Sequence, residues 1–226
     1  MPDPTPIRLA VFDCDGTMVD SERSIADCMA EAFKAHGMAV PSAADVRRMV
    51  GLPLLEAVAR LAPDAGGGVH ERLRDGYKDA FTALRQADAV HEPLYEGVEE
   101  SLAVFEQAGY LLGVATGKAH KGLVNTLATH GLENRFVTLQ TADKAQGKPH
   151  PEMLMNAMAE TGAATADTVM VGDTSYDMEM ARNAGTLAVG VAWGYHERRD
   201  LLVAGAHVVV ESYADLFSTV EDLLNS

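Results

Sequence analysis

Two aspartates separated by one residue follow an apolar run near the start of the chain. The run covers residues 9–12, Asp13 and Asp15 come next, and Gly16 and Thr17 complete the segment. Such a run is typical of a buried strand, whereas an unpaired carboxylate is too costly to bury. Two carboxylates there suit a hard cation, and one of them could attack an electrophile. The same pattern also occurs in ordinary turns, so the interpretation depends on the rest of the chain.

Polar groups recur at other places where a predicted strand ends or a helix begins. They are Thr116, Gly117, Lys148, Asp173 and Asp177. The hydroxyl and backbone N–H groups at residues 116–117 suit an anion, and the lysine lies on a loop stiffened by prolines. Each segment alone could be a helix cap, an exposed lysine or a loop. Ligands of parallel sheets bind where strands end, so the joint pattern predicts one site containing acids, a hydroxyl and a lysine.

Strand and helix patterns alternate along most of the chain, and this alternation positions the polar groups. Strands are predicted at residues 9–12, 111–115, 136–139, 168–171, 187–191 and 208–210. Helical apolar periodicity separates them, for example after Pro151, which suits the first turn of a helix. The pattern predicts an α/β fold, a doubly wound parallel sheet with helices on both faces.

One long segment interrupts the alternation. From residue 19 to residue 91 the strand pattern is absent, and four helical stripes take its place. In the first stripe, Ile25, Met29 and Phe33 share a helix face that ends at Gly37. Further helices are predicted at residues 42–50, 54–61 and 73–84. We therefore expect an all-helical cap at residues 19–91, inserted after the first strand of a core made of residues 1–18 and 92–226.

The composition limits the partners. The 226 residues include 33 acidic and 18 basic side chains, which gives a net charge of −15. Duplex nucleic acid and anionic membranes are unsuitable partners because like charges repel, but a small anionic substrate needs only local positive charge. The two cysteines indicate no disulfide framework. We see no signal peptide at the amino terminus and no membrane-spanning run, so we expect a cytoplasmic protein, acting as a monomer or a dimer.

Together, these residues resemble the motifs of the haloacid dehalogenase superfamily. Asp13 to Thr17 is similar to its first motif, Thr116 to the second, Lys148 to the third, and residues 172–177 to the fourth. The helical insert is similar to the small cap of that superfamily, so the resemblance covers nearly the whole chain. Residues 50–54 and 147–151 look like the phosphoglycolate phosphatase and related pyrophosphatase branch. Cys14 and the Glu-Gly pair at residues 96–97 depart from the common pattern without touching the chemistry.

The resemblance implies Mg²⁺-dependent hydrolysis of a small phosphorylated metabolite, with 2-phosphoglycolate favoured, through an aspartyl-phosphate. Asp13 is the implied nucleophile, and Asp15 the group that protonates the leaving alcohol and then activates water. The implied metal ligands are Asp13, Asp15 through its backbone carbonyl, Asp173 and Asp177, and the implied phosphate-binding groups are Thr116, Gly117 and Lys148. Arg47 and Arg48 in the cap are candidates for binding a substrate carboxylate, whereas Lys118 is expected in a solvated helix start.

Other functions share parts of this pattern. A phosphosugar mutase, similar to β-phosphoglucomutase, and an inorganic pyrophosphatase of the same superfamily stay open, although Thr17 favours a phosphatase over a mutase. A phosphorylated receiver module is also doubly wound, but its lysine follows all its acids, whereas Lys148 precedes Asp173. A dehalogenase would use Asp13 without a metal and leave the other acids without a purpose.

Overall fold

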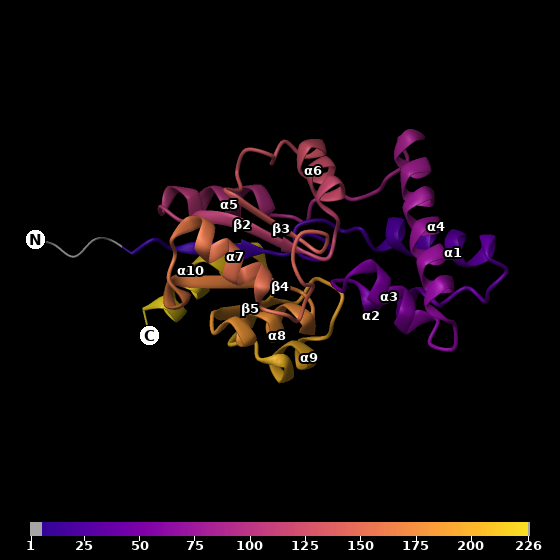
Figure 1. Cartoon of the computed structure of the whole chain (residues 1–226). Helices are drawn as coiled ribbons and strands as arrows, with labels where there is room; N and C mark the ends of the chain where they lie inside the picture. Colours follow the sequence, from indigo (N-terminus) through magenta and orange to yellow (C-terminus); the bar gives the residue numbers. More distant parts are fainter. Residues whose placement is uncertain (1–5, 226) are drawn as a thin grey trace, which may run out of the picture.

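Six parallel strands form the centre of the protein. A computed structural model describes residues 6–225; residues 1–5, where no signal peptide is expected, and residue 226 lie outside the described part. The sheet has the order β3-β2-β1-β4-β5-β6, and Figure 1 shows it on the left, under the helices that cover it. The strands are β1 (Leu9–Phe12), β2 (Leu111–Thr116), β3 (Thr138–Thr141), β4 (Thr168–Gly172), β5 (Leu187–Val191) and β6 (Val208–Val210).

The strand β1 occupies the middle of the sheet, and this explains its apolar sequence. Leu9 pairs with Leu111 of β2 on one side and with Thr168 of β4 on the other. Its alternate residues enter two separate cores, because successive side chains of a strand point to opposite faces. Phe12 belongs to one core and Val11 to the other. Both faces of β1 are therefore buried, as expected for a parallel sheet.

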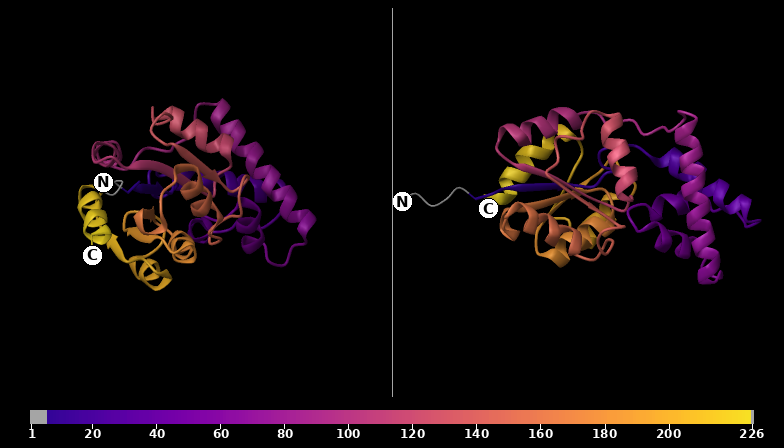
Figure 2. Two further views of the ribbon diagram at one scale, coloured as in Figure 1. Left: turned by 60° about the vertical axis from the view of Figure 1, so that its left-hand side comes forward. Right: turned by 45° about the horizontal axis from the view of Figure 1, so that its top comes forward.

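Helices cover both faces of this sheet. One layer contains α5 (Val98–Gln107), α6 (His120–Thr129) and α10 (Tyr213–Leu224), and the other contains α7 (Glu152–Thr161), α8 (Ser175–Ala184) and α9 (Arg198–Ala204). A 3₁₀ turn at Thr165–Asp167 leads into β4. The second view of Figure 2 shows the two layers above and below the sheet. This arrangement confirms the predicted doubly wound fold.

Two details of the core differ from the sequence prediction. The third strand lies at Thr138–Thr141 rather than at residues 136–139, because its buried side chains are polar. Gln140 donates a hydrogen bond to Thr138, and Thr138 donates one to Glu160, so these groups are buried without losing their partners. The helix α9 was not predicted. It has only seven residues and begins with two arginines, so its apolar periodicity is short.

The remaining helices form a separate bundle beside the ends of the strands. They are α1 (Glu22–Ala35), α2 (Ala43–Met49), α3 (Leu54–Leu61) and α4 (Gly67–Gln86). Ile25, Phe33 and Leu73 belong to a core of their own, and Figure 1 shows the bundle on the right of the sheet. We call these helices with their connections the cap. The proposed boundaries at residues 18 and 92 stay a prediction.

The two chain segments that join the cap to the sheet lie side by side. Val19 and Leu94 form an isolated antiparallel bridge. Next to it, the Asp20 N–H donates to the carbonyl of Pro93 over 2.9 Å. The chain thus enters and leaves the cap at almost one place. No helix within residues 6–225 has the length and apolar character needed to cross a membrane.

Candidate active site

The sheet brings the predicted site residues together, because the three strands that carry them are neighbours. Asp13 follows β1, Thr116 ends β2, and Asp173 follows β4. Each of these side chains is at most 1% exposed. Parallel strands that are adjacent end at the same edge of the sheet, which is the usual ligand site of such folds.

Three carboxylates form a buried cluster around one lysine. Asp13, Asp173 and Asp177 each offer an oxygen that lies within 4.8 Å of the others. The Lys148 Nζ is 2.8 Å from Asp13 Oδ2 and 2.6 Å from Asp177 Oδ1. Burial raises the pKa of Asp13 to about 7, against the opposing effect of Lys148 and with a contribution from Asp177. Burial and the nearby charge of Asp13 also hold the pKa of Asp173 well above its usual range.

The cluster fits a hard divalent cation. With all three carboxylates ionised, the one ammonium group would leave two negative charges uncompensated among buried side chains, and burial accordingly raises the pKa of Asp13 and Asp173. Burying such charge is unfavourable unless a cation balances it, and carboxylate oxygens are the ligands that Mg²⁺ prefers. The carboxylate of Asp15 is outside this group of three.

Local sequence holds the cluster in place. Thr174 caps α8: its N–H donates to Asp177 Oδ2 over 3.0 Å, and the Asp177 N–H donates back to the Thr174 hydroxyl. This capping box leaves the other oxygen of Asp177 to Lys148. Asp173 accepts hydrogen bonds from the Thr17 hydroxyl and the Tyr195 N–H, each 2.8 Å long.

Glycine is the only residue type that fits at position 16, between Asp15 and Thr17. Its φ of +83° is in the left-handed region, and an added Cβ would overlap the carboxylate of Asp173. The turn after the two aspartates therefore needs glycine for its backbone angle and for the close approach of the fourth motif.

A second lysine holds Asp15, and the sequence analysis did not identify it. The ammonium of Lys118 contacts Asp15, whose carboxylate also accepts a hydrogen bond from Ser21. Lys118 is 3.0 Å from Glu92 as well, and Glu92 accepts a hydrogen bond of 2.9 Å from Thr126. Burial lowers the pKa of Lys118, but Asp15 and Glu92 outweigh burial and hold this pKa well above its usual value.

The expectation that Lys118 lies in a solvated helix start was wrong. The helix α6 begins only at His120, so Lys118 is in the loop after β2 and turns into the interior. Its place two residues after the end of a central strand was the signal that could have identified it, because neighbouring strand ends carry the acids.

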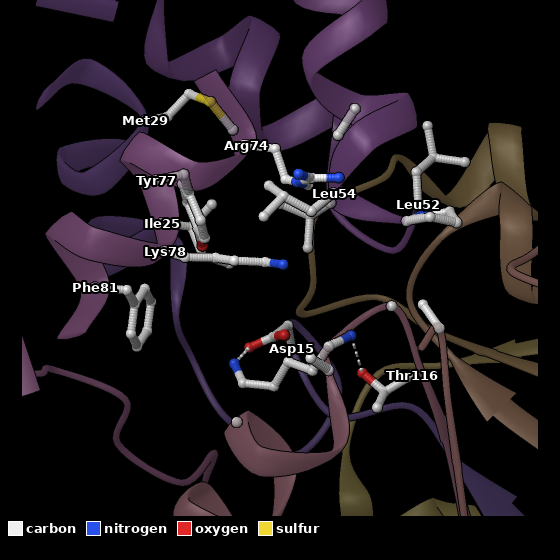
Figure 3. Close-up of a pocket in the computed structure, with 18 of the residues that line it drawn as sticks. Asp15, Ile25, Met29, Leu52, Leu54, Arg74, Tyr77, Lys78, Phe81 and Thr116 are labelled. Atoms are coloured by element: carbon white, nitrogen blue, oxygen red, sulfur yellow. Dashed lines mark hydrogen bonds and ion pairs between the residues drawn. The ribbon is translucent and has the colours of Figure 1, made fainter. Parts of the chain in front are cut away.

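A cavity of about 750 Å³ separates the cap from the strand ends. Asp13, Asp15, Thr116, Gly117 and Lys118 contribute to its wall on the sheet side. Side chains of α4 contribute to the wall on the cap side, and Figure 3 shows them above Asp15 and Thr116. Asp173, Asp177 and Lys148 are buried and do not line this cavity.

Arg47 and Arg48, the candidates for binding a substrate carboxylate, lie away from the cavity. Neither residue lines the cavity. Arg47 instead donates to the carbonyls of Gly194 and Tyr195, over 2.7 and 3.1 Å. The reason is that α2 packs beside the loop after β5, so its last turn joins the cap to that loop. This loop also packs on the core of the sheet, where the Trp193 indole donates to the Thr17 carbonyl.

The connection between α2 and α3 lies directly on the strand ends. A Cβ added to Gly117 would be 2.7 Å from the carbonyl oxygen of Gly51. One added to Gly147 would overlap the ring of Pro53. Both glycines therefore allow the backbone of the cap to approach the edge of the sheet, and the cap covers the site in this structure.

The sequence of this chain is similar to those of known proteins. The family described as haloacid dehalogenase-like hydrolase matches residues 10–191. A protein of Dickeya dadantii named "Probable phosphatase IndB" is 34% identical over 219 residues, covering 96% of this chain and 94% of its own length. A phosphoglycolate phosphatase of Vibrio parahaemolyticus is 29% identical over 220 residues, covering 95% and 96%.

A solved structure shares the fold. The crystal structure of a predicted phosphatase from Clostridium acetobutylicum superimposes with a TM-score of 0.86 and 23% identity. The alignment covers 96% of this chain and 100% of the other. Both the cap and the sheet are therefore features of an arrangement known from experiment.

Proposed function

Because the chain belongs to the haloacid dehalogenase-like hydrolase family and is a phosphatase, we propose that it hydrolyses a phosphate monoester with Mg²⁺ through an aspartyl-phosphate. The observation that carries this proposal is the buried cluster of Asp13, Asp173 and Asp177 around Lys148. Of the three carboxylates in the cluster, Asp13 is the one that also lines the cavity, so a substrate can reach it.

The acid cluster would hold the metal. Asp13, Asp173 and Asp177 supply carboxylate oxygens, and we add the backbone carbonyl of Asp15 to this set. When bound, Mg²⁺ would neutralise charge, so that a carboxylate can approach a phosphate group. Lys148 remains the fixed positive charge of the site and orients Asp13.

The two aspartates after β1 have different roles, nucleophilic attack for Asp13 and proton transfer for Asp15. A carboxylate oxygen of Asp13 attacks phosphorus, and the bond between phosphorus and the ester oxygen breaks. Asp15 gives a proton to that leaving oxygen. It then takes a proton from the water that attacks the phosphorus of the aspartyl-phosphate, which releases phosphate and restores Asp13. Thr116, the Gly117 N–H and Lys148 bind phosphoryl oxygens during both steps.

The substrate proposed here is a small phosphorylated acid. One relative is named as a phosphoglycolate phosphatase, and 2-phosphoglycolate is the smallest phosphate ester of a hydroxy acid. Its carboxylate would need a cation other than Arg47 or Arg48, because neither lines the cavity.

A phosphate-release assay over a panel of esters tests this proposal. The panel includes 2-phosphoglycolate, other small monoesters and inorganic pyrophosphate, each with Mg²⁺ and with a chelator. We expect Mg²⁺-dependent release from at least one monoester. Conversion of a sugar 1-phosphate in the presence of its bisphosphate, without release of phosphate, would indicate a mutase instead. Release from pyrophosphate alone would indicate a pyrophosphatase, and release that survives the chelator would contradict the metal site.

A further inference from the structure

One face of α4 is turned toward the cavity, although Tyr77 on this face also packs against the core of the cap. Arg74, Tyr77, Lys78, Phe81 and Arg85 are three or four residues apart, which places them in one stripe on the helix. All five line the cavity, whereas Leu73 of the same helix is completely buried in the cap. The stripe is therefore available to a ligand.

Lys78 and Arg85 are the two cations of this stripe without an ion pair among the described residues, and the guanidinium of Arg85 lies over the ring of Phe81, 5.5 Å from its centroid. Figure 3 shows the side chain of Lys78 extended into the cavity above Asp15. Within residues 6–225, its ammonium has neither a hydrogen bond nor an ion pair. The neighbouring Arg74 is already paired with Asp75 over 2.8 Å, and on the opposite wall Asp15 and Glu92 balance Lys118. An anionic group of a ligand could thus bind the ammonium of Lys78 without displacing an existing hydrogen bond or ion pair.

Most of the cavity wall is apolar. Ile25, Met29, Leu52 and Leu54 contribute to it together with the rings of Tyr77 and Phe81, whose centroids are 5.9 Å apart. Aromatic and aliphatic walls of this kind bind the carbon body of a ligand. Here the binding surface continues from the phosphate site at Asp13 to the helix α4.

The cavity also has room for a substrate larger than 2-phosphoglycolate. Its volume is about 750 Å³. If each non-hydrogen atom took the ~30 Å³ that one water molecule takes in the liquid, 2-phosphoglycolate would fill about a third of that volume.

We propose that the substrate is a phosphate monoester whose alcohol part has a ring-sized apolar body and a second acidic group, which binds Lys78. This inference rests on the proposed function, since it assumes that the phosphate is bound at Asp13. It specifies the phosphorylated acid of the proposed function further, as an ester whose alcohol part is larger than that of 2-phosphoglycolate. Lys78 then acts as a specificity-determining residue that touches the substrate outside the reacting atoms.

Four esters separate the contribution of the body from that of the acid. Ethyl phosphate has neither feature, 2-phosphoglycolate has the acid, benzyl phosphate has the ring, and 4-carboxybenzyl phosphate has both. All four have alcohol leaving groups. We expect the carboxybenzyl ester to have the highest kcat/KM, with the ring and the carboxylate each raising it about tenfold. A higher kcat/KM for 2-phosphoglycolate than for the carboxybenzyl ester would overturn the proposal.

Variants of α4 assign each contribution to a residue. Lys78→Met should remove the gain from the carboxylate, Lys78→Arg should restore part of it, and Phe81→Leu should reduce the gain from the ring. Arg72→Met is the matched control, because Arg72 is an exposed cation of the same helix that does not line the cavity. Equal losses on all four esters in Lys78→Met would place Lys78 at the phosphate and overturn its assignment.

The test distinguishes this inference from the proposed function. If no ester is hydrolysed, the proposed function fails. Calorimetric binding of the same four esters to the Asp13→Asn protein then decides the inference alone. Tighter binding of the carboxybenzyl ester, lost in the Lys78→Met double variant, supports it, and equal binding of all four overturns it.

Discussion

The Nζ of Lys118 lies 3.0 Å from Oε1 of Glu92, so a lysine at the edge of the sheet is bound to the segment that leads out of the cap. Lys118 also contacts Asp15, the residue to which we assign proton transfer. The connection between the two parts of the protein and the proposed acid therefore share one cation. All three side chains are nearly buried, which makes their interactions strong and the loss of a partner costly.

Glu92→Gln should weaken this connection. The amide keeps the shape of the side chain but removes its charge, so we expect the free energy of unfolding to fall by about 1–3 kcal/mol. Urea unfolding followed by circular dichroism measures this. Glu96→Gln serves as the control, since Glu96 is an exposed acid of the same segment. Equal stability of the two variants would show that the Lys118–Glu92 contact contributes nothing.

Asp13→Asn should remove the nucleophile. The amide has nearly the same size but no nucleophilic charge, so kcat should fall by at least ~10³, roughly 4 kcal/mol of barrier. Initial rates at saturating Mg²⁺ give this value. Asp143→Asn is a suitable comparison, because Asp143 accepts hydrogen bonds from Thr141 and His120 without belonging to the acid cluster. A variant with nearly wild-type turnover would refute the role given to Asp13.

Asp15→Asn should separate proton transfer from metal binding. The Asp15 carboxylate is outside the acid cluster, and we assign only its backbone carbonyl to the metal. We therefore expect Mg²⁺ affinity to change little, whereas turnover collapses or phosphorylated enzyme accumulates. Titration with Mg²⁺ and mass spectrometry of quenched protein report the two properties. A large loss of Mg²⁺ affinity would assign the carboxylate to the metal instead.

Without metal, stability should fall as the pH rises toward neutrality. Burial raises the pKa of Asp13 to about 7, while an unfolded aspartate titrates near pH ~4. Between these values the folded protein binds a proton that the unfolded chain has lost, so the free energy of unfolding decreases with increasing pH.

Unfolding in a chelator at several pH values measures this slope. The raised pKa of Asp173 should steepen it in the same direction. Mg²⁺ should reduce the slope and raise the melting temperature, because it binds the folded carboxylates. An Asp13→Asn protein should lose part of the slope. If it retains all of it, the titration belongs to other groups.

Gly117→Ala should disturb the contact between the cap and the sheet. The new methyl group would lie 2.7 Å from the Gly51 carbonyl oxygen, so the connection between α2 and α3 must move away. We expect kcat/KM to fall by about tenfold or more, because the cap no longer excludes water from the site. Gly122→Ala is the matched control, since nothing lies within 4 Å of the position of its added Cβ. Similar activity of the two variants would contradict this account.

The sequence was sufficient to predict which residues meet at the site when they directly follow central strands. Asp13, Thr116 and Asp173 depend only on the parallel sheet, whose strand ends coincide. Arg47 and Lys78 depend on how the cap packs against the sheet. Helical periodicity identifies the faces of a helix but not which face meets the other part of the protein.

The position of β1 has a consequence for how the chain folds. Its partners β2 and β4 begin at Leu111 and Thr168, so β1 is synthesised long before the strands that flank it. Until β4 has been synthesised, at least one edge of this completely buried apolar strand remains unpaired and prone to aggregation. Because these pairings join distant parts of the sequence, refolding of the sheet should be slow, and nascent chains ending before residue 168 should depend on chaperones.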